Sequence, residues 1–174
     1  MLHVVRQGLP RWSLLFVSLV SIGCAEPNGE AAPWTTSARG LGPVTIGMTR
    51  SAAGAVLEAQ LTGPAGINDC TYLRAATGLE GVLFMEVMGQ IVRIDVTAPG
   101  ISTAEKVAVG TPIAEVLNAY PSGVTRGPHK YTDGEYLTVA PDVGHRIVFE
   151  TDRERVTRYR VGRLPEVEWV EGCS

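Results

Sequence analysis

The sequence lacks the short motifs that identify the common enzyme classes. No second histidine stands at ligand spacing from His129, no nucleophile elbow is present, and no glycine-rich phosphate loop follows an expected strand. A basic excess is missing too, because 15 Lys and Arg residues face 18 Asp and Glu residues, for a net charge of −3. Such a chain has no overall positive field that would attract nucleic acid. The leading interpretation therefore includes no catalytic residue, no metal, no cofactor and no nucleic-acid partner.

Apart from residues 12–22, no apolar run approaches the length of a membrane span. That run has eleven residues, whereas crossing a bilayer takes about 20. Arg6 and Arg11 precede it without any acidic residue, and Gly23 follows it. A basic segment, a short apolar run and a small residue, in this order, are typical of a secretory signal, which we predict for residues 1–23. The alternative, a buried N-terminal helix, is disfavoured by the polar, proline-bearing stretch that comes next.

The residues at the end of this signal suggest a lipid anchor. Ser21-Ile22-Gly23-Cys24 resembles the lipobox of bacterial lipoproteins, although serine stands where leucine is usual. The resemblance implies a diacylglyceryl group on Cys24, and two acyl chains suffice for stable membrane anchoring. A cut after Ala25, releasing a soluble periplasmic or secreted protein, is the alternative. We predict that residues 24–40 are the lipid-attachment cysteine and a flexible spacer, because few large apolar residues occur there.

Cysteine is scarce, with three in the chain. If Cys24 carries the lipid, Cys70 and Cys173 remain, in a compartment where disulfides persist. We predict that they pair and join the C-terminus to the first half of the fold. A loop of about 100 residues closed in this way contributes roughly 4 kcal/mol in the chain-entropy model. Two free thiols are the alternative.

An internal repeat organises the rest of the chain, with three pairs of matching segments 63 to 65 residues apart. It divides the chain into repeat 1, residues 41–100, and repeat 2, residues 101–174. Each repeat begins with a short amphipathic run behind Thr49 or Thr111, which predicts a helix. Alternating runs then predict three strands per repeat, at 70–75, 81–88 and 91–97, and at 134–140, 145–151 and 155–161. We predict an α+β fold of two tandem α-β-β-β units, whose antiparallel sheet has helices on one face and an open second face.

Two segments carry a resemblance to known families. Ile46-Gly47-Met48-Thr49 begins the first helix, and Val109-Gly110-Thr111 is its weaker counterpart in repeat 2. A helix with this start, followed by three antiparallel strands and duplicated in tandem, resembles the β-lactamase inhibitory protein fold. It is also similar to the SmpA/OmlA lipoproteins of the outer-membrane assembly machinery. The resemblance implies an architecture for residues 40–165, but no inhibitory contact residue can be carried over.

Alternation along the strands predicts which side chains face the helices. Val92, Ile94 and Val96, with their counterparts in repeat 2, should point inward. The open face would then mix apolar residues with arginines, as protein-binding surfaces do. We predict partner-binding residues at five positions: Arg93, Arg158, Arg160, Leu83 and Met85. The alternative is a solvated hairpin whose charges prevent edge pairing.

The densest polar cluster lies in residues 128–135, where repeat 1 has no equivalent. His129 could act as a base, and His129, Asp133 and Glu135 could together bind a metal. An ordinary polar surface loop is the preferred interpretation, with His129, Lys130 and Tyr131 as further binding candidates. The leading functional hypothesis is a lipid-anchored envelope protein that binds a protein partner. The alternatives are an envelope hydrolase or metal-dependent enzyme that uses this loop, and a module that binds a small ligand or glycan between the repeats.

Overall fold

The computed structural model describes residues 1, 3 and 34–174. The predicted signal peptide, Cys24 and most of the predicted spacer lie outside the described residues. Among those that are described, no helix has the length and apolar character needed to cross a bilayer.

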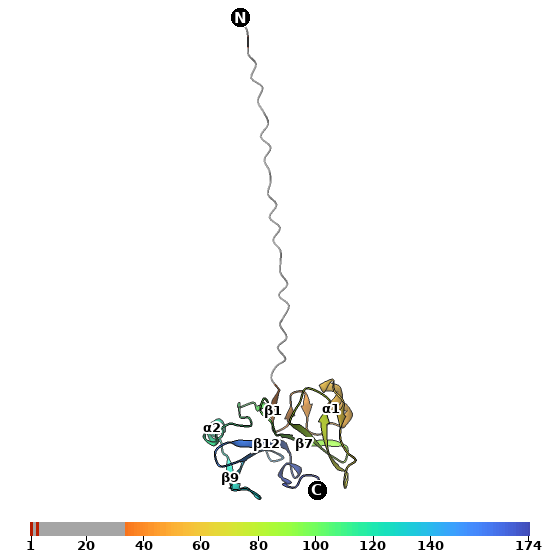
Figure 1. Cartoon of the computed structure of the whole chain (residues 1–174), viewed down its shortest axis with the longest axis vertical. Helices are drawn as coiled ribbons and strands as arrows, with labels where there is room; N and C mark the ends of the chain where they lie inside the picture. Colours follow the sequence, from red (N-terminus) through yellow and green to blue (C-terminus); the bar gives the residue numbers. More distant parts are fainter. Residues whose placement is uncertain (2, 4–33) are drawn as a thin grey trace. The chain divides into compact units, whose positions relative to one another are not determined.

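An eight-stranded antiparallel sheet forms the centre of the fold. Its strands, in spatial order, are β4 (Leu61–Thr62), β5 (Cys70–Ala75), β6 (Val82–Val87), β7 (Gln90–Val96), β12 (Val156–Arg163), β11 (His145–Thr151), β10 (Glu135–Val139) and β9 (Thr125–Pro128). The two repeats therefore supply four adjacent strands each. They meet at the antiparallel pair β7 and β12, which lie side by side in Figure 1. Six of these strands match the six predicted runs to within two residues.

A second, smaller sheet stands against the first. It has the order β3 (Val44–Thr45), β2 (Gly40–Leu41), β1 (Thr35–Ser37) and β8 (Ser102–Thr103), with β1 and β8 parallel. Residues 35–40 thus belong to the folded part, and the prediction that the spacer extends to residue 40 is wrong at its C-terminal end. Thr36 explains the difference, because it is fully buried and its hydroxyl lies 3.1 Å from that of Tyr159.

The helices are short. They are α1 (Arg50–Leu57) and α2 (Ile113–Ala119), with a 3-10 turn at η1 (Glu166–Glu168). Thr49 caps α1 as predicted, since its hydroxyl accepts a hydrogen bond from the Ala52 N–H at 3.2 Å. The N-cap of α2 is Pro112, which has no side-chain cap hydrogen bond. The two helices lie at opposite ends of the folded part in Figure 1.

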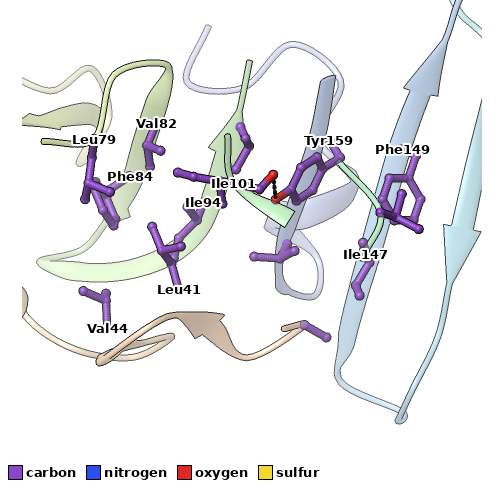
Figure 2. Close-up of a cluster of buried hydrophobic side chains, with 14 of the residues drawn as sticks. Leu41, Val44, Leu79, Val82, Phe84, Ile94, Ile101, Ile147, Phe149 and Tyr159 are labelled. Carbon is purple, nitrogen blue, oxygen red and sulfur yellow. Dashed lines mark hydrogen bonds between the residues drawn. The ribbon is translucent and has the colours of Figure 1, made fainter. Parts of the chain in front are cut away.

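The predicted α+β class is wrong, because the described residues are mostly β-structure, with an eight-stranded and a four-stranded sheet and only two α-helices. Helices of eight and seven residues cannot cover a sheet of eight strands. The smaller sheet contributes to the cover instead, with Leu41 and Val44 in the main core. Figure 2 shows these two residues on the side of the cluster opposite Leu79 and Val82, and Tyr159 pointing into it from β12. Phe149 packs on Tyr159, with ring centroids 5.6 Å apart.

Two matching irregularities change the predicted faces of the strands. The register of β6 against β7 shifts between Met85 and Glu86. The register of β11 against β12 shifts at the equivalent place in repeat 2, between Glu150 and Thr151. Each shift leaves one residue without a partner, Val92 in β7 and Thr157 in β12, as in a β-bulge. Ile91 consequently joins the main core, whereas Val92 packs on the second face. The prediction that Val92 faces inward is wrong because the bulge inserts Val92 between Ile91 and Arg93 and turns its side chain to the second face.

The second face of the sheet is not open, and this part of the prediction is also wrong. Residues 164–174, called here the C-terminal segment, lie against β7, β11 and β12 through η1. The disulfide between Cys70 and Cys173 fastens the segment to β5 and confirms the predicted pairing. Beneath it, Met85 and Val92 are fully buried and pack with the buried Cys70.

Candidate functional site

A network of charged side chains occupies the second face of the sheet. Arg93 bonds Asp95 within β7 through two nitrogens, at 2.8 and 2.5 Å. In repeat 2, Glu150 of β11 accepts a hydrogen bond from Arg160 on one carboxylate oxygen and one from Arg158 on the other. The second of these measures 2.6 Å. Arg160 and Asp95 lie opposite each other in the register of β12 and β7. This register places the Arg93–Asp95 pair of repeat 1 next to the Arg158, Arg160 and Glu150 cluster of repeat 2. Because strand alternation directs these residues to one face, the network follows from the pattern recognised in the sequence.

The C-terminal segment removes two of these arginines from solvent. Arg93 donates to the backbone oxygens of Trp169 and Glu166, at 2.6 and 3.3 Å. Arg160 donates to the backbone oxygen of Val167 at 2.7 Å. Neither these two residues nor Met85 is therefore on an exposed surface, and their predicted role in partner binding is not supported by their positions. Leu83 is half-buried on the same sheet.

Glu150 is the centre of the network. Burial tends to raise the pKa of its carboxyl, but the hydrogen bonds from His129 and Arg158 and the charge of Arg160 outweigh it and hold the pKa below its ordinary value. Burial lowers the pKa of the Arg160 guanidinium, and the nearby Arg93 lowers it further. Glu150 therefore stays ionised and offsets the positive charges around it. The sequence analysis did not single it out, although the repeat aligns this charged residue with an apolar methionine, Met85.

His129 holds its loop in place through both ring nitrogens. Its Nδ1 accepts hydrogen bonds from the backbone N–H groups of Tyr131 and Thr132, both at 3.1 Å. Because Nδ1 accepts, the ring hydrogen lies on Nε2, which is 3.0 Å from Glu150 Oε2 and donates to it. The ring also stacks on Tyr136, with centroids 4.6 Å apart. No lone pair of His129 is left to accept a proton from a substrate.

The three predicted metal ligands are separated. Asp133 is 87% exposed and pairs with Arg153 at 3.2 Å. Glu135 forms two bonds of 2.6 Å to Arg126, which lower the pKa of its carboxyl. Within residues 34–174, the structure brings no three His, Cys, Asp or Glu side chains into a metal-binding group. The geometry thus offers the enzyme hypothesis neither a base at His129 nor a metal centre.

Arg158 forms the exposed end of the network. Its side chain is 54% exposed and lines a hollow of about 530 Å³ with His129, Glu150 and the loop at 132–134. Lys130 is exposed and pairs with Glu171 at 2.6 Å, and Tyr131 is exposed beside it. Of the predicted binding residues, the structure therefore leaves Arg158, Lys130 and Tyr131 accessible.

The network carries one positive charge in excess. Arg93, Arg158 and Arg160 supply three positive charges, Asp95 and Glu150 supply two negative ones, and the difference is +1. His129 adds none, because its hydrogen bonds require the neutral ring. Arg158 is the member of the network that reaches solvent, and the hollow beside it is also lined by Asp133, which pairs with Arg153, and by Asp152, which accepts two backbone hydrogen bonds.

Comparisons with known proteins bear on the fold alone. No family model matches the chain, and no curated protein matches it in sequence. Among solved structures it is similar to the crystal structure of the uncharacterized protein yfeY from Escherichia coli, with a TM-score of 0.53 and 15% identity. The match covers 74% of this chain and 99% of that one. It supports the architecture described above, while the resemblance to β-lactamase inhibitory proteins and SmpA/OmlA lipoproteins stays a prediction.

Proposed function

We propose that this protein is a lipid-anchored binding module of the bacterial cell envelope, which captures an acidic group of another envelope protein at Arg158. The observation that carries the proposal is the 54% exposed guanidinium of Arg158, which lies at the end of an otherwise buried charge network and is held there by Glu150. This site replaces the wide open face expected from the sequence. It is smaller, and it is built on the second repeat alone.

Export is supported by the sequence of residues 1–23 and by the disulfide. The bridge joins residues 103 positions apart, and such bonds persist mainly in oxidising compartments. The lipid on Cys24 rests on the lipobox resemblance. A membrane anchor would keep the module near other envelope proteins.

Arg158 is prepared for a carboxylate. Its Nε is bonded to Glu150, which orients the plane of the guanidinium and leaves the two terminal nitrogens for a ligand. A flat fork of this kind pairs with a carboxylate through two parallel hydrogen bonds. Because the side chain is anchored beforehand, less conformational entropy is lost on binding. An Asp or Glu side chain of a partner fits this geometry.

A role in binding agrees better with the site than a role in catalysis. The one histidine of the hollow uses both nitrogens to hold the loop and Glu150. Glu150 is kept ionised by its own partners and is committed to Arg158 and Arg160. A general base needs a free lone pair within reach of substrate.

The test is the affinity for an acidic probe. A fluorescein-labelled peptide of four glutamates should bind the disulfide-bonded protein at low salt, and Arg158→Gln should weaken binding about tenfold or more. Arg158→Lys keeps the charge but loses the fork, so it should restore only part of the affinity. Arg74→Gln removes an exposed arginine of repeat 1 and should bind as the parent does. Equal affinity of the parent and Arg158→Gln would remove the proposal, and thermal unfolding of each variant verifies that it is folded.

A further inference from the structure

A second hollow lies on the other side of the large sheet, away from the charge network. It is bounded by the end of α2, the turn between β1 and β2, and the turn between β10 and β11, and its volume is about 720 Å³. Small-molecule sites commonly measure about 300–1,000 Å³ and have mainly apolar walls with a few polar groups. Here the apolar wall includes Ala119, Val139, Pro141 and Ile147. The hollow has the size of a ligand site, and its wall combines these apolar residues with polar and charged ones.

Tyr120 gives this hollow a fixed wall. Its ring packs on Phe149, with centroids 5.8 Å apart, and it is buried. Its hydroxyl lies 2.7 Å from Glu105 Oε2 and 2.8 Å from Thr103 Oγ1. Burial raises the pKa of this phenol, so the hydroxyl keeps its proton. The charged carboxylate is the stronger acceptor, and the Tyr120 hydroxyl therefore donates to Glu105 and orients it.

The charges that line the hollow leave Glu105 uncompensated. Arg39 and Asp142 form an ion pair of 2.6 Å and neutralise each other. Hydrogen bonds from the Gly144 N–H and from His145 outweigh partial burial and lower the pKa of Asp142 to about 2, so that pair persists near neutral pH. Within residues 34–174 no ion pair involves Glu105.

The end of α2 reinforces this negative character. The last turn of the helix contains no basic residue, and a helix C-terminus carries a partial negative charge. This end of the helix lies in the wall of the hollow through Ala119 and Tyr120. A cation bound in the hollow would therefore lie near both the carboxylate of Glu105 and the C-terminal end of α2.

We infer that this hollow binds a small primary amine with an apolar ring or branched aliphatic body. The ammonium group bonds Glu105 Oε1, the oxygen that Tyr120 does not use. The apolar body lies against Pro141 and the small exposed parts of Val139 and Ile147. This site does not involve Arg158, so an experiment can contradict the amine site without contradicting the proposed function, and the reverse.

Three probes of one shape test the charge preference. Phenethylamine, 2-phenylethanol and 3-phenylpropionate have the same aromatic body with a positive, neutral or negative end. Titration of the disulfide-bonded protein, followed by NMR or calorimetry, should show the amine binding about tenfold or more tighter than the acid, with the alcohol between them. Equal binding of amine and acid, or binding of none of the three at millimolar concentration, would overturn the inference.

Variants locate the site. Glu105→Gln should weaken phenethylamine about tenfold while leaving the alcohol unchanged. Ala140→Trp places a large side chain on an exposed position of the lining and should weaken all three probes. Glu80→Gln, an exposed acid of repeat 1, is the matched control and should bind as the parent does. Unchanged amine affinity in Glu105→Gln contradicts the assignment, and unchanged melting temperatures exclude misfolding as the cause of a loss.

Discussion

Arg160 of β12 and Glu150 of β11 form an ion pair that the C-terminal segment shields from water, their side chains being 4% and 6% exposed. The segment contributes directly, because Arg160 also donates to the backbone oxygen of Val167. A buried pair of this kind stabilises the fold only while both charges are present.

Removal of Glu150 should therefore be costly. Glu150→Ala leaves Arg160 buried without its carboxylate and should lower the free energy of unfolding by about 3 kcal/mol, measured by urea denaturation. Glu135→Ala is the matched control, since it breaks the more exposed pair with Arg126 and should cost about 1 kcal/mol or less. Similar losses in the two variants would show that the buried network has no special weight.

Asp142 should make stability depend on pH in the acid range. Its pKa is about 2 in the folded protein against an ordinary value of 3.8. A carboxyl with a lowered folded pKa contributes stability that is complete above the unfolded pKa and disappears as pH falls through the folded one. The stability difference between the parent and Asp142→Asn should therefore shrink as the pH falls from about 4 to about 2. Urea denaturation across this range measures it, and a difference that does not change with pH contradicts the assignment.

Loss of the disulfide should loosen the C-terminal segment. A variant with both Cys70 and Cys173 changed to Ala should lose about 2–4 kcal/mol of unfolding free energy. Because Trp169 lies near the bridge, its fluorescence should shift to the red as it becomes more hydrated. The parent in reducing agent should behave like the variant. Unchanged fluorescence in both would mean that other contacts alone hold the segment on the sheet.

His129→Ala should affect the loop more than the fold. The backbone N–H groups of Tyr131 and Thr132 lose their acceptor, so their hydrogen exchange should accelerate about tenfold or more, measured by NMR. Lys130→Ala removes a neighbouring exposed ion pair and should leave both exchange rates nearly unchanged. Equal effects of the two substitutions would argue against the acceptor role of His129.

The anchor can be tested on the processed protein. Expressed in a bacterium with lipoprotein processing, the mature chain should begin at Cys24 and carry the additional mass of acyl chains. Cys24→Ser should move the protein from the membrane to the soluble fraction. An unmodified N-terminus after Ala25 would instead support simple secretion.

The repeat and its strands were predictable because they are local and doubled. Phe84 and Phe149 occupy matching places in alternating runs, and both lie in the core. The bulges were not predicted, although the adjacent apolar residues Ile91 and Val92 interrupt the alternation that residues 93–96 keep. The candidate site was found in part: Arg158 and the loop at 129–131 were recognised from their residue types, but Glu150 was missed.

The sequence by itself determined the strands, the pairing of Cys70 with Cys173 and the face on which the arginines gather, since these depend on period, number and alternation. The tertiary structure decided which of those arginines are accessible. Arg93 and Arg160 are covered because residues 164–174 return across the sheet and offer them backbone oxygens, whereas Arg158 is not. Burial depends on segments that are distant along the chain, and no local pattern records which of them will meet.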